Sequence, residues 1–218
     1  MKHLSILLAL MLAAIMPAAA QITHTGKGAV DKNAEKILTK AAQQFKGNAV
    51  SFTVTMISKD ENKKEVARQQ AEVLYHQGKY RVSVKDNVIY CDGQSTWHWN
   101  KSANEVVVNK MSTADDDLIN PAAILANYTK NYRTKFIREE QDGTAVVDLI
   151  PLKAKSYHKL RLLVKTATGT LQRMEVHNYD GTQAEYRVSN FKTNVKASAT
   201  SFTFSASDNP KVEVIDMR

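Results

Sequence analysis

Apolar residues follow a helical spacing near the start of the chain and a strand spacing after it. Between residues 30 and 45 they recur at every third or fourth position, which predicts a helix with one buried face. Asp31 is the expected N-cap, because its carboxylate can accept hydrogen bonds from the free amides of the first turn, and Gly47 lies just past the end. From Val50 to Met56 apolar and hydroxyl side chains alternate, which predicts a strand with one apolar face.

The alternation continues in about ten short segments that turn residues separate. We expect strands at residues 50–56, 71–75, 80–84, 97–99, 106–108, 134–139, 145–152, 160–164, 171–177, 184–188 and 202–204. Asp92-Gly93 and Asp142-Gly143 favour tight turns between neighbouring strands. Short strands with little helix between them predict a mainly β (α+β) fold, in which one antiparallel sheet rolls into a half-open, strongly curved barrel.

Residues 90–128 set aromatic strand segments beside a short apolar helix. Trp97 and Trp99 are two positions apart, so they share one face of a strand. Asn120-Pro121 is typical of an N-cap followed by proline at the first helical position. The helix that follows is too short and apolar to be stable alone, so we expect it to cover the tryptophan face as a lid. The expected lid residues are Pro121, Ile124, Leu125 and Tyr128.

Two helices cannot fill a large barrel, so the pattern predicts a concave sheet whose mouth the helices cover and whose interior is a hydrophobic cavity. The side chains expected to line this cavity are the apolar positions of the first strands together with the two tryptophans. They are Phe52, Val54, Met56, Val73, Tyr75, Tyr80, Val82, Trp97 and Trp99. Aromatic residues at period two more often belong to an ordinary core, and that reading stays open from the pattern alone.

The first twenty residues have the order of a cleaved secretory signal peptide: a lysine, an apolar run and then small residues. The run is shorter than the roughly 20 residues that a membrane-spanning helix needs. We therefore expect residues 1–20 to be removed and residues 21–218 to form a single exported domain. Removal of Lys2 lowers the net charge from +8 to +7, and the lysines are spread along the chain. This distribution favours a solvated surface over a nucleic-acid site.

The candidate chemistry of the chain is sparse. Cys91 is the single cysteine; it cannot form an internal disulfide, it lies too far from the cleavage site to carry a lipid anchor, and its apolar neighbours favour an inert thiol. The histidines lie on separate segments without metal-ligand spacing, and no nucleophile elbow or phosphate loop is present. We expect no enzyme activity, no metal and no cofactor.

The order of these features over the mature chain resembles the LolA-type outer-membrane lipoprotein carriers, periplasmic proteins of Gram-negative bacteria. The shared features are the helix that ends near Phe45, the Gly78-Lys79-Tyr80-Arg81 turn, Asp92-Gly93 followed by the two tryptophans, the Asn120-Pro121 helix, Gly169-Thr170-Leu171, Asp180-Gly181, and Phe202-Thr203-Phe204 with residues 212–216. In that family an arginine at the start of the second hairpin strand holds the lid. The matching position here is His76, with Arg81 close by, so these two residues are the expected polar gate.

The resemblance implies a periplasmic chaperone that is not an enzyme and that carries lipoproteins from the inner to the outer membrane with their acyl chains in the cavity. Its implied partners are lipoprotein acyl chains, an inner-membrane lipoprotein-releasing transporter and an outer-membrane acceptor, and we expect it to be a monomer that binds no nucleic acid. A second function stays open at this point. Periplasmic regulators of the same fold bind lipid or a membrane partner in envelope-stress signalling, so the chain could be such a sensor or interaction module.

Overall fold

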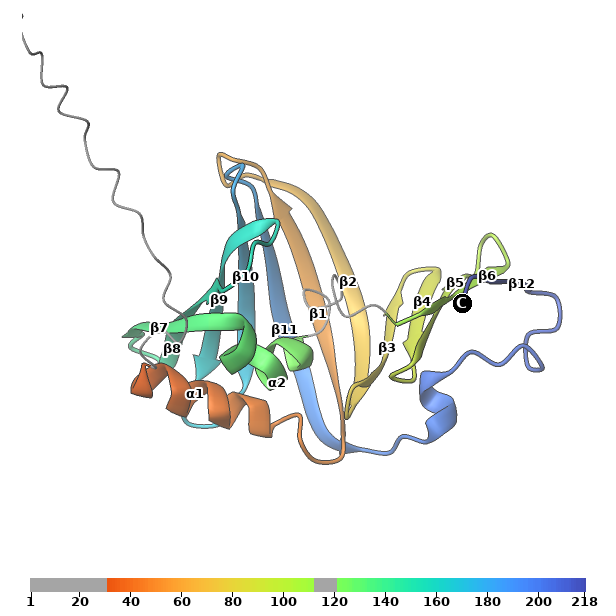
Figure 1. The fold of residues 1–218 in the computed structure, drawn as a ribbon, viewed down its shortest axis with the longest axis horizontal. Coiled ribbons are helices and arrows are strands. Elements are labelled where there is room, and N and C mark those ends of the chain that lie inside the picture. The colour runs from red at the N-terminus through yellow and green to blue at the C-terminus, as the bar shows by residue number, and fades with distance from the viewer. Residues whose placement is uncertain (1–30, 112–120) are drawn as a thin grey trace, which may run out of the picture.

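The computed structural model describes residues 31–111 and 121–218, which form one large curved sheet with two helices on one side (Figure 1). The sheet has 12 strands in the order β12-β6-β5-β4-β3-β2-β1-β11-β10-β9-β8-β7. The strands are β1 (Ala49–Lys59), β2 (Glu65–His76), β3 (Lys79–Val84), β4 (Asn87–Cys91), β5 (Ser95–Asn100), β6 (Glu105–Lys110), β7 (Tyr132–Glu139), β8 (Thr144–Pro151), β9 (Tyr157–Lys165), β10 (Leu171–Asn178), β11 (Gln183–Val195) and β12 (Glu213–Asp216). The predicted signal segment lies outside the described residues.

The mainly β fold and the antiparallel, strongly curved sheet are confirmed. The sheet does not close into a barrel, because β12 and β7 are its two edges. The strand pairs are antiparallel except for β12, which runs parallel to β6. No helix in the part of the chain that the structure describes is long and apolar enough to cross a membrane.

The first helix begins where its capping residue predicts, but it ends at Gln43, two residues before the predicted end at Phe45. Helix α1 (Lys32–Gln43) follows Asp31, whose carboxylate accepts hydrogen bonds from the backbone N–H groups of Asn33 and Ala34. Helix α2 (Pro121–Asn131) is three residues longer than the predicted segment that ended at Tyr128. The expected N-cap at Asn120 lies outside the described residues.

Strand pairing gives the sheet two chemically different faces, because side chains alternate between the faces along each strand. Phe52 lies opposite Val73, and Val73 lies opposite Val82, so these three side chains share one face. We call this the inner face, because its side chains pack with helices α1 and α2 in one hydrophobic core. The opposite face is the outer face; Thr53, Glu72 and Ser83 share it.

The expected last strand at residues 202–204 is wrong. Residues Ala199–Phe202 form a 3-10 turn, η2, that lies against the outer face. Phe202 is buried there against Ala49 and Leu74 in a small second core. The segment after it runs along β3–β6 and returns to the sheet as β12 (Figure 1). Two aromatic residues at period two can anchor a loop as well as a strand, and the sequence does not separate the two cases.

Candidate functional site: the apolar inner face

The inner face of β1, β2 and β3 brings most of the predicted cavity residues together. Each of these strands contributes two side chains that are at least nine-tenths buried, and Met56 packs against them while partly exposed. The six buried residues are Phe52, Val54, Val73, Tyr75, Tyr80 and Val82. They belong to one core cluster in which the side chains pack against one another, so the described residues form a packed apolar surface and not the open, lined cavity that the sequence predicted.

Four aromatic rings form the centre of this surface. The centroid of the Phe45 ring lies 6.3 Å from Phe52, 5.8 Å from Tyr75 and 5.7 Å from Phe191, in edge-to-face geometry in each case. Phe52 and Phe191 are stacked with centroids 5.8 Å apart. Neither Phe45 nor Phe191 was among the residues predicted to line the cavity. Phe191 faces inward because β11 has an irregularity near Asn190, whose φ is +53°, and this breaks the alternation that would have assigned the face.

This surface has few polar atoms, and the hydroxyl of Tyr75 among them is hydrogen-bonded. The hydroxyl of Tyr75 accepts a hydrogen bond from the backbone N–H of Gly78 at 2.9 Å. Burial raises the pKa of Tyr75, although this hydrogen bond opposes the rise, and burial also raises the pKa of Tyr186. Both phenols are therefore neutral at physiological pH. A neutral, aromatic and aliphatic surface suits an apolar ligand.

Helix α2 places its apolar side chains into this same core. Ile124, Leu125 and Tyr128 are 1%, 2% and 7% exposed and belong to the cluster that contains Phe52 and Val82. Helix α2 contacts α1 and β7, and the hydroxyls of Tyr128 and Thr39 lie 3.4 Å apart. Pro121 begins the helix, and its side chain is outside the described residues. Three of the four predicted lid residues thus cover the predicted apolar face.

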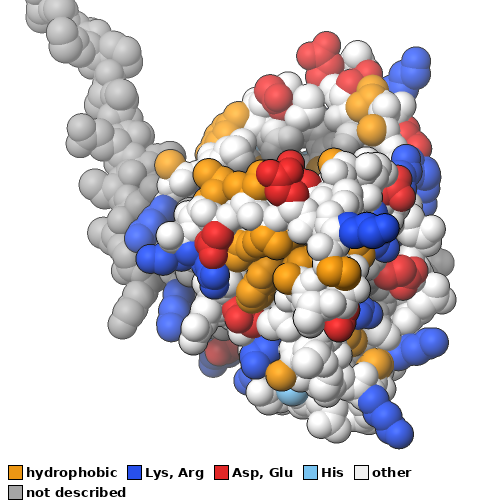
Figure 2. All heavy atoms as spheres, turned by 90° about the vertical axis from the view of Figure 1, so that its right-hand side faces the viewer, with side chains coloured by type: hydrophobic (Ala, Val, Ile, Leu, Met, Phe, Trp, Pro, Cys, Tyr) orange, Lys and Arg blue, Asp and Glu red, His pale blue; other side chains and the backbone are white. Residues whose placement is uncertain are grey.

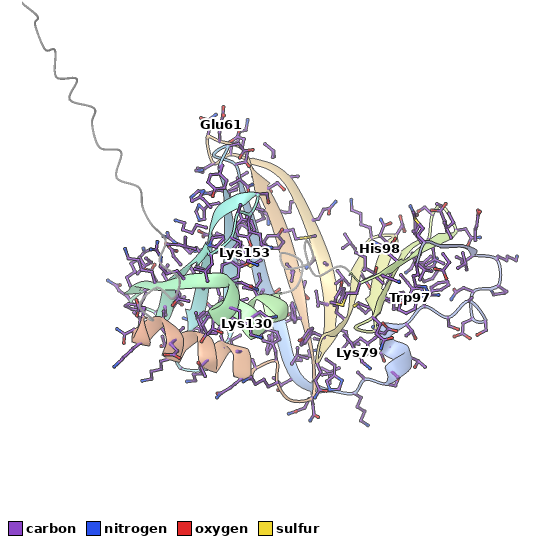
Figure 3. The ribbon with its side chains drawn as sticks, in the orientation of Figure 1. Glu61, Lys79, Trp97, His98, Lys130 and Lys153 are labelled. Carbon is purple, nitrogen blue, oxygen red and sulfur yellow. The ribbon has the colours of Figure 1, made fainter. Side chains whose placement is uncertain are left out.

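The two tryptophans do not belong to this site. Trp97 lies opposite Tyr90 and Val108, and the register continues from Tyr90 through Arg81 to Leu74 on the outer face. The prediction that α2 covers the tryptophan face is therefore wrong. The error has a physical reason. Along a strand, residues an odd number of positions apart lie on opposite faces, and the tryptophans are an odd number of positions from the inward-facing residues. The turn lengths that set the register were not known from the pattern. Figure 3 shows Trp97 and its neighbour His98 on opposite sides of β5.

Trp99 helps to hold the C-terminal segment on the outer face. Its ring centroid lies 5.3 Å from Phe204 in edge-to-face geometry, and Tyr90 approaches the same phenylalanine at 6.4 Å. The ammonium of Lys101 lies 5.3 Å from the centroid of the Trp99 ring. Trp99, which was expected to line the cavity, thus packs together with Tyr90 against the protein's own C-terminal segment.

The predicted polar gate also lies on the outer face. His76 follows inward-facing Tyr75 in β2, and its ring packs 6.4 Å from Phe202. Arg81 lies opposite Leu74 and Tyr90. Burial raises the pKa of Tyr90, and the charge of Arg81 opposes that rise. Neither residue shares a face with Ile124 or Leu125, so the gate as predicted from His76 and Arg81 is wrong.

The inner face continues beyond the core onto β3–β6 with less cover. Val84, Ile89 and Met111 are partly buried and pack against the core from this side. Cys91 is fully buried among them, and its sulfur lies 3.8 Å from the sulfur of Met111. Figure 2 shows hydrophobic side chains in the middle of the face that the β6–β12 side of the molecule presents, with charged side chains around them. Because Val84, Ile89 and Met111 are only partly buried, the inner face extends from a closed core to a partly open margin.

Comparison with known proteins identifies the fold family. A search among curated proteins found no match. An uncharacterized conserved protein from Thermus thermophilus has a similar structure, with a TM-score of 0.59 at 12% identity over 85% of this chain and 99% of that one. A DUF1329 family protein from Desulfovibrio piger gives a TM-score of 0.50 at 13% identity over 80% and 98% of the two chains. A LolA superfamily protein from Nitrosomonas europaea gives 0.44 at 16% identity over 78% and 97%.

At these identities the likenesses to the Thermus thermophilus and Desulfovibrio piger proteins show a shared fold and no more. A sequence model of one family, described as outer membrane lipoprotein carrier protein LolA, matches residues 78–205, which is more than half of the chain. The matched region begins at the turn before β3 and includes the partly open margin, α2 and the strands β7–β11. The chain therefore belongs to the LolA family of outer membrane lipoprotein carrier proteins.

Proposed function

We propose that this protein is a periplasmic carrier that binds the acyl chains of lipoproteins on its inner face, with α2 as a movable lid. One observation supports this most directly: Ile124 and Leu125 fill the same core as Phe52 and Val82. The described structure is then the closed, ligand-free state, in which lid side chains occupy the place of an acyl chain. In this proposal the protein receives lipoproteins from an inner-membrane lipoprotein-releasing transporter and passes them to an outer-membrane acceptor.

The energies of binding and release are of compatible size. Burial contributes about 0.8 kcal/mol per methylene, so an acyl chain of about fifteen methylenes gains on the order of 12 kcal/mol. Binding must first displace the lid, which removes about 1.5–3 kcal/mol of burial for each of Ile124 and Leu125. This competition lowers the net affinity and makes release possible without any chemical step.

Hydrogen bonds hold α1 against the sheet, so α2 is the better candidate for movement. The carboxylate of Asp31 accepts a hydrogen bond from the backbone N–H of Phe136, while the ammonium of Lys40 donates to the carbonyls of Thr166 and Ala167. The side-chain amide of Gln44 donates to the carbonyl of Thr168. The N-terminal end of α1 is thus hydrogen-bonded to β7, and its C-terminal end is hydrogen-bonded to the β9–β10 turn.

Displacement of a fluorescent hydrophobic probe by an acylated peptide tests the proposal. Leu125→Ala removes a buried competitor and should weaken the closed state by about 2 kcal/mol or more, which raises probe affinity by about thirtyfold. Leu152→Ala is the matched control, because Leu152 is 48% exposed. Val82→Asp should lower affinity, since it places a charge on the apolar face. Unchanged affinity in folded Leu125→Ala would contradict the lid.

Capture of partners from envelope extract distinguishes carriage from signalling. Lipoproteins and a lipoprotein-releasing transporter should be retained by the wild-type protein, and Val82→Asp should lose the lipoproteins. Recovery of a membrane anti-sigma factor in their place would favour a sensor that uses the same apolar face.

A further inference from the structure

The outer face carries a groove of about 740 Å³ on the side of the sheet opposite the apolar site. Its lining includes three arginines and three hydroxyl side chains from β1, β2, β8, β10 and β11. These residues are Arg68, Arg173, Arg187, Thr55, Thr144 and Ser189. Arg187 lies opposite both Thr55 in β1 and Arg173 in β10, which fixes the groove on the outer face.

Two of the arginines face each other directly. Arg173 and Arg187 are a cross-strand pair, and like charges in this position destabilise a sheet. The next pair on the same face of these strands is Glu175 opposite Glu185. The Nε of Arg173 lies 3.3 Å from Glu175, and its Nη1 lies 3.5 Å from Glu185. Arg187 and Lys59 also donate to Glu185.

This arrangement directs positive charge into the groove. Both glutamates lie two residues along their strands from the arginines, and neither lines the groove, whereas both arginines do. The acidic residues that do line it are already paired: Glu140 with Arg138, and Asp142 with Lys165. The side chains of Arg68 and Arg187 are about half exposed. Arg68 donates from Nε and Nη2 to Glu65, and Arg187 donates from Nε to Glu185, so each guanidinium keeps further Nη N–H donors for a ligand.

We propose that this groove docks an extended, acidic segment of a partner protein. Guanidinium groups bind carboxylates through paired N–H donors, and the hydroxyls of Thr55 and Ser189 can donate to backbone carbonyls of the segment, whereas the Thr144 hydroxyl already donates to Gln172. An anionic membrane fits less well, because a flat bilayer touches the rim of a recessed groove on a curved sheet, and charges farther away than about 8 Å are screened at physiological salt.

The docking surface is independent of the apolar site. The groove and the core occupy opposite faces of the same sheet, so a partner can bind the outer face while the inner face is open or loaded. The inference does not depend on the proposed carriage of acyl chains, and a protein that failed to bind acyl chains could still bind an acidic segment here.

Fluorescence anisotropy with a short labelled peptide of alternating glutamate and serine tests the proposal. Saturable binding is expected, with an affinity that falls as salt rises and that Arg173→Gln/Arg187→Gln lowers at least about tenfold. Arg133→Gln/Lys135→Gln makes the same change in charge at exposed positions of β7 outside the groove and should leave affinity within about twofold of the wild type.

A further variant separates docking from folding. Arg68→Gln leaves the partners of Glu185 in place and should still lower peptide affinity, while the binding of the hydrophobic probe to the inner face stays unchanged. Three results would overturn the inference: no saturable peptide binding, an equal loss in the β7 control, or arginine-dependent binding to vesicles of anionic phospholipid without binding to the peptide.

Discussion

Glu185 is a carboxylate that the sheet buries and nevertheless keeps charged. It is 2% exposed, so burial by itself would raise its pKa. Hydrogen bonds and charge from Arg187 and Lys59 outweigh burial and lower the pKa to about 2. A buried carboxylate of this kind stabilises the fold as long as its cations are present and it remains ionised.

The acid stability of the protein should depend on this residue. The pKa is lower in the folded state than the ordinary value of 4.5, so the stabilisation is complete above about pH 4.5 and is lost as the pH falls toward about 2. Glu185→Gln should reduce the free energy of unfolding at pH 7 by on the order of 3 kcal/mol and flatten its decline below pH 4.5. Urea titrations at pH 7 and pH 3 measure this change.

Glu61→Gln is the matched control for Glu185, because it makes the same substitution at an exposed turn between β1 and β2. Its unfolding curves should follow those of the wild type at both pH values. An unchanged acid slope in Glu185→Gln would show that other carboxylates determine acid stability.

At the scale of the elements, the attachment of α1 depends on a close approach between its backbone and the β9–β10 turn. Gly169 has φ +77°, and a Cβ at this position would lie 2.8 Å from the backbone oxygen of Lys40. The same turn supplies the carbonyls that Lys40 and Gln44 bind. One glycine therefore permits the contact that holds the end of α1, and with it Leu38 and Phe45, on the inner face.

Gly169→Ala should destabilise the protein by more than about 1 kcal/mol, because it adds both a strained φ and a steric clash with backbone atoms. Thermal unfolding followed by circular dichroism measures the loss. Gly47→Ala is the control, since no atom lies within 4 Å of the Cβ it would add and the residue has no positive φ. Equal melting temperatures for the two variants would show that the turn can move away from α1 at no cost.

At the scale of the whole molecule, the sheet separates an apolar inner face from an outer face that binds the protein's own C-terminal segment and carries the arginine groove. Both tryptophans report on the outer face, and the inner face carries the aromatic cluster around Phe52. Mutations on one face should therefore leave the other face largely unaffected, because the backbone of the sheet lies between the two sets of side chains.

Phe204→Ala tests this separation. It should expose the ring of Trp99 and shift tryptophan emission to longer wavelength, while the affinity of the inner face for the hydrophobic probe stays unchanged. Phe52→Ala is the reciprocal variant: it should lower stability by about 3–5 kcal/mol and change probe binding, with little effect on tryptophan emission. A change in probe affinity in Phe204→Ala would show that the two faces are coupled.

Much of the fold followed from local patterns. The period of two located ten of the twelve strands, apart from their exact ends. No segment was predicted for β4 or β12, and the segment predicted at residues 202–204 is not a strand. Asp31 marked the start of α1 because capping is a property of adjacent residues. Six inner-face residues of β1–β3 were recognised together, since neighbouring hairpins with short turns keep their parity.

Three features thus depend on interactions over a few residues and could be predicted from the chain alone: which residues alternate, where the turns and caps lie, and that a short apolar helix needs an apolar partner. Only the tertiary structure decided which face each alternating set occupies. Trp97 and Trp99 were expected to line the cavity and His76 and Arg81 to gate it, but all four lie on the outer face, while Phe191 was missed and lies inward. The physical reason is that the face of a strand depends on its register with distant strands and on irregularities such as that at Asn190, and a shift of one residue exchanges the two faces.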